Sequence, residues 1–521
     1  MKKTHYALGA LVLALIVTAI IFVDPKRPSA NEYPRTPSYA ISANDSSALK
    51  DVIASKIVAH PGQTGFKLIT TGKDSLLFRL AMIEAAQRSL DIQYYIIEDD
   101  MTGKLVLQAL QTAADRGVRV RILMDDLNMR GSDTTWPLLN ANPHIEIRIF
   151  NPFATRDEPL FTRISDVFTG LGQFSKRMHN KVMIADNQVA ITGGRNVGDE
   201  YFDASSDFNF HDVDVLAVGE IVPHISKSFD QYWNNKESFP IAALHSLKAD
   251  SKILSSFREH LQSHWQKKMQ DDTITEPSPL TEQLKNDRIA LLWANAELAE
   301  DNPSKIDLPK AATDSKPANR LDNIAANTHH EFMIVSPYFV PGDEGTQTLA
   351  ALVKKGVKVK ILTNSLASTD VIATYTGYRR YRKSLVEDGI DLYEMQPIPG
   401  VHEHSRRFSS ASRSSLHSKI YVADRHDVVI GSFNLDPRSV SLNTEMVLVI
   451  HSPELAGQLN AMFEKATSPS RSFHLVIQNH QLEWIDSEDG KEHTYESEPD
   501  SSFWQKLKLD LFALLPFEDQ L

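Results

Sequence analysis

Two short stretches of the chain carry the same arrangement of side chains that could do chemistry. Both follow the pattern His-x-Lys, four residues, Asp, six residues, Gly, a small residue, any residue and Asn. The first copy runs from His179 to Asn196 and the second from His417 to Asn434, so they lie 238 residues apart (417 minus 179). Because side chains alternate along a strand, the His and the Lys of each copy are expected on one face.

These residue types predict a site for a phosphoryl group. The groups suited to hold anionic oxygens are Lys181, Lys419, Asn196 and Asn434. The two histidines, His179 and His417, offer a nucleophile and a general acid, which substitution at phosphorus requires. Two repeats related by a pseudo-twofold axis can bring both copies to one place. We therefore expect cleavage or transfer of a phosphodiester through a phosphohistidine.

Other catalytic patterns are missing from the sequence. The chain has no Cys, which removes thiol catalysis, disulfides and Cys-based zinc sites. It also has no HExxH, no Asp-rich metal loop and no P-loop. We expect no metal and no cofactor in this reaction.

The elements around the motifs also occur twice. A buried strand, an amphipathic helix and a second strand are predicted, first over 89–96, 103–117 and 118–126 and again over 331–340, 345–356 and 357–365. Gly117 and Gly356 close the two helices and are 239 residues apart (356 minus 117), almost the offset of the motifs. Such strand-helix-strand units form parallel strands that need helices on both faces. We expect an α/β fold of two pseudo-symmetric repeats, each a mixed, mostly parallel sheet flanked by helices, with the active site at their interface.

The repeats predict a division of the chain into domains. The first catalytic domain is expected over 48–240 and the second over 285–470, joined by a polar, Pro-containing connector over 241–284. A C-terminal extension follows over 471–521, and residues Phe503, Trp504, Leu507, Leu511, Leu514 and Leu515 fall near helical spacing in it. That helix is expected either to pack on its own domain or to lie on a membrane surface.

The N-terminus indicates where the protein resides. Residues 6–23 form an 18-residue run without a charge, the length of a short membrane-spanning helix. We expect residues 1–24 to be an uncleaved membrane anchor, with a cleaved signal as the alternative, and 25–47 to be a linker. Export of the body of the chain would place it in the periplasm, anchored to a bacterial inner membrane.

Composition bears on the partners. The chain has 521 residues, 42% of them hydrophobic, which can fill the cores of two or three domains. Its formal net charge of −12 gives no general attraction to a polyanion, which argues against nucleic acid as a partner.

The duplicated motif resembles the signature of the phospholipase D superfamily, and the sequence is most similar to the bacterial cardiolipin synthases, in particular those of the C type. The resemblance extends from about residue 65 to the C-terminus. Besides the motifs, it rests on the segments "LDIQYYI", "AADRGVRVRILMDDL", "GGRNVGDEYFD", "NFHDVDVLAVGE", "SFDQYWN", "SPYFVPG" and "LLPFEDQL".

The resemblance implies roles for the motif residues. His179 would be the nucleophile and His417 the proton donor to the leaving oxygen, although the pseudo-symmetry allows the reverse. The four Lys and Asn side chains named above would hold the phosphoryl oxygens. Asp186 and Asp424 complete the two catalytic motifs and tend to be structural in this family.

The resemblance also implies that a downstream carboxylate orients each histidine. Glu445 and Asp212 are the matching candidates, and Asp214 competes with Asp212. Three tyrosines that follow the first strands of the repeats either line the cleft or pack in the core: Tyr94, Tyr95 and Tyr338.

The implied reaction makes cardiolipin from phosphatidylglycerol and a second phospholipid, which is phosphatidylglycerol or phosphatidylethanolamine. A phospholipase D that uses water as the acceptor is the alternative within the same chemistry. A phosphodiester nuclease would need a long basic groove, and an inactive lipid-binding scaffold would be expected to have lost a motif His or Lys, whereas all four are present.

Overall fold

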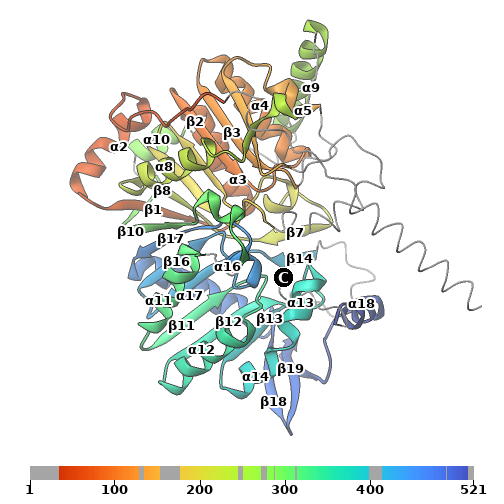
Figure 1. Cartoon of the computed structure of the whole chain (residues 1–521). Helices are drawn as coiled ribbons and strands as arrows, with labels where there is room; N and C mark the ends of the chain where they lie inside the picture. The colour runs from red at the N-terminus through yellow and green to blue at the C-terminus, as the bar shows by residue number, and fades with distance from the viewer. Residues whose placement is uncertain are drawn as a thin grey trace, which may run out of the picture.

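The computed structural model describes residues 35–127, 134–152, 176–244, 250–270, 279–286, 288–310, 314–397, 413–488 and 490–513. Two α/β halves of the same design make up the molecule, with the first half above the second in Figure 1. This confirms the expected fold of two phospholipase D-like repeats.

The first half begins with a helix that leads into the sheet. Its elements are α2 (Ala48–Ala59), β1 (Thr64–Ile69), α3 (Gly72–Ala85), β2 (Ser89–Tyr94), α4 (Met101–Asp115), β3 (Arg119–Asp125), α5 (Thr135–Leu139), β4 (Ile145–Phe150), β5 (Val182–Ala185), β6 (Val189–Gly193), β7 (Phe208–His211), β8 (Asp214–Gly219), α8 (Ile221–Trp233) and β9 (Ser238–Pro240). Two helices follow, α9 (Ser251–Gln270) and α10 (Leu280–Lys285).

The second half has a similar order, except that β14 precedes its motif strand β15, whereas β7 follows β5 and β6. Its elements are β10 (Leu292–Glu300), α11 (Lys316–Ala326), β11 (Glu331–Val335), α12 (Gly342–Lys354), β12 (Lys358–Asn364), α13 (Ile372–Arg379), α14 (Arg382–Glu387), β13 (Asp391–Met395), β14 (Arg413–Leu416), β15 (Ile420–Ala423), β16 (Asp427–Gly431), α16 (Pro437–Ser441), β17 (Met446–His451) and α17 (Pro453–Ala466). The chain ends in β18 (Ser472–Gln478), β19 (Gln481–Glu488), β20 (Lys491–Tyr495) and α18 (Phe503–Ala513).

One continuous sheet joins the two halves. β1 pairs with β8 of its own half and with β10 of the other, and β10 pairs with β17. The strands on the two sides of this junction follow in mirror order, β8-β6-β5-β2-β3-β4 in the first half and β17-β16-β15-β11-β12-β13 in the second. The junction therefore sets the two motif strands, β5 and β15, in equivalent places.

The expectation of mostly parallel strands needs correction. Only β2-β3-β4 and β11-β12-β13 run parallel within this sheet, and its other pairings are antiparallel. The helical crossovers α4 and α12 explain the parallel part, because such strands need a crossover to return the chain. Short turns join the remaining motif strands, for example β5 to β6 and β15 to β16, and short turns give antiparallel pairs.

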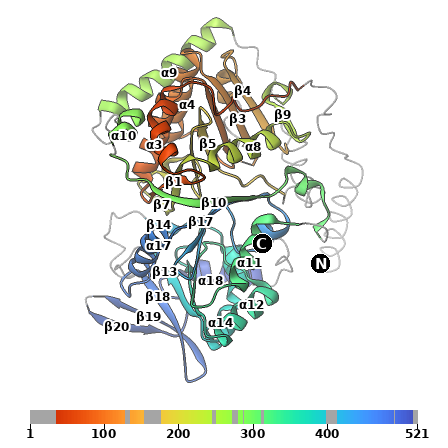
Figure 2. The same ribbon diagram turned by 90° about the vertical axis from the view of Figure 1, so that its left-hand side faces the viewer.

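Helices cover both faces of each half-sheet. In the first half α3 and α4 pack on one face, together with Leu90 and Ile92 of β2, and α8 packs on the other (Figure 2). In the second half α11 and α12 cover the outer face, and α17 covers the inner one. The inner faces of both halves, with α8 and α17, form a single central core. Burial of this shared core holds the two repeats in one fixed arrangement.

Local signals explain where the helices begin and end. Thr71 accepts a hydrogen bond from Asp74 N at the start of α3, and Asp100 accepts one from Gly103 N at the start of α4. Gly117 and Gly356 follow α4 and α12 with φ of +92° and +89°, a conformation that favours glycine. The same turn therefore ends the equivalent helix in both repeats.

The segments outside the two repeats are attached to them. In the connector, α9 packs on α4, and α10 packs on α2. Beyond residue 470, β18 pairs with β13 and so extends the second half-sheet by a three-stranded meander. The expected anchor over 1–24 lies outside the described residues, as do residues 25–34 of the linker. In the part of the chain that the structure describes, every helix is too short or too polar to span a bilayer.

Candidate active site

The two motif histidines precede equivalent strands, and each is fixed by backbone of the other repeat. His179 comes before β5 and donates its backbone N–H to Thr444 O at 2.9 Å. His417 comes before β15 and donates its backbone N–H to His211 O at 2.8 Å. Around the second contact β14 pairs with β7, and around the first Met178 bridges to Thr444. The histidines thus sit on the seam between the repeats, as the motif duplication predicts.

Each imidazole also contacts a carboxylate of the other repeat. His179 Nδ1 lies 2.9 Å from Glu445 Oε2, and His417 Nδ1 lies 2.7 Å from Asp212 Oδ2. Glu445 and Asp212 are the two acids that the sequence pointed to. The competing Asp214 instead pairs with Arg79 at 3.0 Å and accepts a hydrogen bond from Ser75 Oγ.

Burial and the surrounding charges determine the protonation of both imidazoles. Burial lowers the pKa of His179 to about 4, against the opposing effect of Glu445, and burial together with Lys419 lowers the pKa of His417 to about 3. Although burial raises it, contact with His417 holds the pKa of Asp212 at about 2. A carboxylate can only accept, so Nδ1 carries the proton and Nε2 keeps its lone pair. Both imidazoles are therefore neutral in the substrate-free protein at neutral pH.

The two lysines occupy equivalent positions beside the histidines. Lys181 Nζ donates to His179 O at 2.7 Å, and Lys419 Nζ donates to His417 O. Burial and the charge of Lys419 lower the pKa of Lys181 to about 7, and burial lowers the pKa of Lys419 to about 8. The charge of Lys419 acts on Lys181, and a phosphodiester bound near both lysines would raise both pKa values.

Aromatic rings complete the walls of the site. Tyr95 packs edge-on against His179 at 5.0 Å between ring centres, and Tyr338 faces His417 at 6.3 Å. Lys181 Nζ lies 5.3 Å from the centre of the Tyr95 ring. Tyr94, in contrast, is buried in the core, where its hydroxyl accepts from Arg79. Of the three tyrosines considered from sequence, two therefore line the site and one packs in the core.

The two motif asparagines differ in their contacts. Asn196 donates from Nδ2 to the Tyr201 hydroxyl at 2.9 Å and accepts from Ile96 N, so both ends of its amide are engaged. Asn434 is buried, and its Oδ1 has no hydrogen-bond partner among the described residues. A buried amide oxygen without a hydrogen-bond partner is costly. The hydroxyl group of a bound alcohol, or a water molecule, could donate a hydrogen bond to it.

The motif acids lie at the far end of their strands from the histidines. Asp186 accepts backbone N–H groups of Gln87, Arg88 and Ser89 in the turn after β5. Asp424 does the same after β15, for the backbone N–H groups of His329, His330 and Glu331. Both carboxylates therefore hold the motif strand against the strand beside it, and neither reaches the reacting groups.

Several contacts could not be found from the sequence. Ser432 Oγ donates to Glu445 Oε2, and Ser439 Oγ donates to Glu445 Oε1 at 3.0 Å. Tyr201 and Phe210 pack their rings against His417 at 5.4 and 4.9 Å. Only Ser432 carries a signal, because it occupies the small-residue position of its motif, and the other three are isolated polar or aromatic residues.

One group of side chains with metal-binding potential was found among the described residues. His426 and His451 both direct Nδ1 at Asp427 Oδ1, at 2.6 and 2.7 Å. The group lies after β15 and at the end of β17, whereas His417 and Glu445 precede those strands. It is therefore at the opposite end of the strands from the motif histidines.

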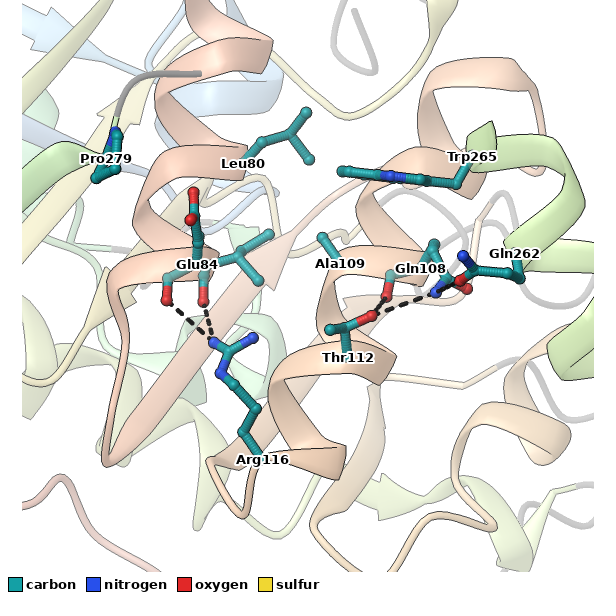
Figure 3. A pocket seen from close by; sticks show the side chains of 10 residues that line it. Leu80, Glu84, Gln108, Ala109, Thr112, Arg116, Gln262, Trp265 and Pro279 are labelled. Atoms are coloured by element: carbon teal, nitrogen blue, oxygen red, sulfur yellow. Dashed lines mark hydrogen bonds between the residues drawn. The ribbon is translucent and has the colours of Figure 1, made fainter. Parts of the chain in front are cut away.

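A cavity of about 400 Å³ lies between α3, α4 and α9 in the first repeat (Figure 3). Its polar side chains bond to one another and to backbone: Gln108 donates to Gln262 at 2.8 Å, and Arg116 donates to the carbonyls of Ile83 and Glu84. It contains none of the motif residues. This cavity is therefore separate from the seam that holds the two motif histidines.

Comparison with known proteins gives a consistent result. The family described as "Cardiolipin synthase, PLD-like domain" matches residues 80–233 and 321–467. The chain is 38% identical over 468 residues to cardiolipin synthase C of Escherichia coli, covering 88% of this chain and 96% of that protein. It is 25% identical to cardiolipin synthase A of Pseudomonas entomophila over 78% of this chain and 69% of that one. A solved phosphatidylserine synthase of Haemophilus influenzae has the same fold, with a TM-score of 0.54 at 11% identity, covering 82% of this chain and 92% of that one.

Proposed function

The chain belongs to the family of cardiolipin synthases with phospholipase D-like domains, and we propose that it joins the phosphatidyl group of one phospholipid to a hydroxyl of phosphatidylglycerol to make cardiolipin. Family membership makes it a phosphatidyltransferase of the phospholipase D superfamily. The single observation that carries the reaction is the pair of neutral imidazoles, each held at Nδ1 by a carboxylate of the opposite repeat.

In the first step, His179 Nε2 attacks the phosphorus of the donor lipid. The bond from phosphorus to the head-group oxygen breaks, and His417 gives a proton to that oxygen. The negative charge of the bound phosphodiester raises the pKa of both imidazoles, which allows His417 to carry that proton. Lys181 and Lys419 balance the charge on the phosphoryl oxygens.

In the second step, an acceptor hydroxyl attacks the phosphorus of the phosphatidyl group on His179. His417 Nε2 takes the hydroxyl proton, the bond from phosphorus to nitrogen breaks, and both histidines return to their starting state. With phosphatidylglycerol as acceptor the product is cardiolipin, and the alcohol released in the first step is glycerol or ethanolamine, according to the donor.

The neighbouring residues support His179 as the nucleophile. Its Nδ1 has two acceptors, Glu445 Oε2 and Ser432 O at 3.1 Å, whereas His417 Nδ1 has Asp212 alone. Two acceptors hold a ring more firmly in line with phosphorus, and a fixed geometry favours attack.

The C-terminal helix supports action at a lipid surface. Leu509 of α18 is buried, Gln505 bonds to Leu366 O, and Asp510 pairs with Arg379 at 3.1 Å. This attachment leaves an apolar stripe exposed along the opposite side, made of Phe503, Trp504, Leu507 and Leu511. Aromatic residues of this kind favour the interface of a bilayer. We infer that α18 rests on the membrane that supplies the substrates.

Product analysis by mass spectrometry tests this function. Purified protein is supplied with vesicles of phosphatidylglycerol alone and of phosphatidylglycerol with phosphatidylethanolamine, and His417→Ala serves as the blank. Cardiolipin that depends on His417 is the expected product, and ethanolamine release would identify the second donor. Phosphatidic acid without cardiolipin would mean that water is the acceptor and would refute the transferase assignment.

A further inference from the structure

A second cavity, of about 300 Å³, lies in the second repeat between α17 and the inner face of the sheet. Its lining is mostly apolar and includes Met333, Leu362, Met395, Leu416, Leu459 and Phe463. A volume of about 300 Å³ is at the lower end of the usual range for small-molecule sites, which are mostly apolar with a few polar groups. The cavity is therefore suited to part of a hydrocarbon chain.

The mouth of this cavity is polar and positively charged. Thr70, His211, Lys465 and Arg471 line it and are exposed. No carboxylate among the described residues forms an ion pair with Lys465 or Arg471. Two cations at the rim of an apolar cavity are complementary to an anionic head group attached to an apolar chain.

The equivalent space in the first repeat is filled. The buried positions of α8 and α17 match at an offset of 234, for example Phe229 with Phe463 (463 minus 229), and this match sets Tyr232 opposite Ala466. Phe150 of β4 pairs with Asp125 of β3. Met395 of β13 holds the equivalent position in the second repeat, where it pairs with Asn364 of β12. Tyr232 and Phe150 pack on each other at 5.5 Å in the first repeat. In the second repeat smaller side chains replace both rings, and the cavity lies beside them.

The cavity also adjoins the catalytic pair. Leu416 and Ser418, on either side of His417, belong to its lining, and so does Asp212, which holds His417 Nδ1. A molecule in the cavity would therefore lie behind one histidine without occupying the phosphoryl site between the two.

We propose that this cavity binds one fatty-acyl chain of an anionic lipid, with the head group held by Lys465 and Arg471. The site is additional to the phosphoryl site and retains a lipid beside the reacting histidine. A lipid bound here need not react, so this binding is separate from the transfer reaction.

Photochemical labelling tests the site directly. The full chain with His179→Ala, which prevents turnover, is placed in phosphatidylcholine vesicles that contain a little phosphatidylglycerol with a diazirine in one acyl chain. After illumination, we expect labelled peptides from α17 and from β11 to β13. Ala466→Tyr, which restores the ring of the first repeat, should reduce this labelling at least tenfold, and Ala461→Tyr on the exposed side of the same helix should not.

A second substitution guards against a variant that fails to fold. Met395→Phe, which copies Phe150, should reduce the labelling several-fold. Labelling of α17 that persists in both Ala466→Tyr and Met395→Phe would overturn the proposal, and so would an equal loss in Ala461→Tyr.

The charged mouth is tested by the head group. Lys465→Gln with Arg471→Gln should lower labelling several-fold, and diazirine phosphatidylcholine should label α17 weakly. A fatty acid that carries a diazirine tests whether the head group must be a phosphate. Labelling by both this fatty acid and phosphatidylglycerol would define the ligand as any anionic amphiphile. Equal labelling by phosphatidylcholine would refute the role of the cations. These measurements do not depend on product formation. A failure of the proposed lipid binding can therefore be distinguished from a failure of the proposed cardiolipin synthesis.

Discussion

The two repeats share a backbone design but differ in the residues around the carboxylates that contact the histidines, Asp212 and Glu445. In the first repeat Gly194 occupies the small-residue position, and a Cβ there would lie 2.3 Å from Asp212 Oδ1. In the second repeat Ser432 occupies that position and donates to the longer Glu445, which also accepts from Ser439. The shorter acid therefore needs a glycine, and the longer acid has room for a hydroxyl. In both repeats the carboxylate contacts the histidine of the other repeat, but the residues that surround the carboxylate differ.

The same comparison extends to the interior. Tyr232 and Phe150 fill the first repeat, while Ala466 and Met395 leave a cavity in the second. A cavity in a core costs stability. The first repeat is thus filled behind its histidine, while the second has the cavity that we propose as a binding space.

The roles of the two histidines give the largest expected effect. His179→Ala and His417→Ala should each lower turnover at least about 10⁴-fold, because each removes a group that acts in both steps. A donor with a good leaving group should leave a phosphatidyl adduct on His179 in the His417→Ala protein, identified by mass spectrometry at low temperature. An adduct on His417 in the His179→Ala protein instead would reverse the assignment.

The two lysines should behave alike if the site is symmetric in charge. Lys181→Met and Lys419→Met should each reduce kcat/KM by about 10²- to 10³-fold, because each removes a donor to the phosphoryl oxygens.

Burial lowers the lysine pKa values to about 7 and 8, so the folded protein binds fewer protons than the unfolded chain between about pH 7 and pH 10.5. The contribution of these groups to stability therefore rises with pH, while substrate affinity falls as they lose charge.

Calorimetry and a pH profile measure the two trends together. Lys181→Met should raise Tm by about 2 °C, because a charge buried beside another charge is removed. The KM of the wild type should rise between pH 7 and pH 9. A lower Tm in both Met variants would show that the lysines stabilise the fold, and the symmetric charge account would be wrong.

The crossing carboxylates should have unequal effects. Glu445→Gln and Asp212→Asn should each lower kcat by about 10²-fold, because an amide can hold the wrong tautomer of the histidine. Glu445→Gln should be the milder change, since Ser432 O remains as a second acceptor for His179 Nδ1. Steady-state kinetics with circular dichroism as a folding check would measure this, and an unchanged kcat in both variants would contradict the positioning role.

The motif acids should affect stability and leave kinetics intact. Asp186→Asn should cost about 2 kcal/mol and Asp424→Asn about 1 kcal/mol, since both hold three backbone N–H groups but only Asp186 is fully buried. The amide keeps the positive φ that both positions adopt. Urea unfolding measures the difference, and a large loss of kcat at full folding would assign these acids to catalysis.

The smallest expected effect concerns α18, which has no counterpart in the first repeat. Phe503→Ser with Trp504→Ser should weaken binding to phosphatidylglycerol vesicles several-fold, because both rings leave the interface. Val58→Ser, at an apolar residue of α2 that is 80% exposed, is the matched control. Vesicle sedimentation of a chain that starts after residue 34 isolates this contribution, and equal binding by both variants would remove α18 from the membrane contact.

The sequence by itself determined the duplicated motif, the repeat offset and the phosphoryl chemistry. His179, Lys181, His417 and Lys419 could be identified because residue type and strand alternation are local properties. The βαβ units could be predicted for the same reason. A helix that ends at Gly117 or Gly356 and is followed by an apolar strand has a periodic pattern in the sequence.

Only the tertiary structure decided which carboxylate meets which histidine. Glu445 reaches His179 across 266 positions and Asp212 reaches His417 across 205, and no local pattern encodes contacts of that separation. Asp212 and Asp214 are alike in sequence, but Asp212 lies between β7 and β8 and meets His417, whereas Asp214 begins β8 and meets Arg79. The antiparallel majority of the sheet and the cavity beside Ala466 have the same cause, because both depend on how strands and helices from distant parts of the chain dock.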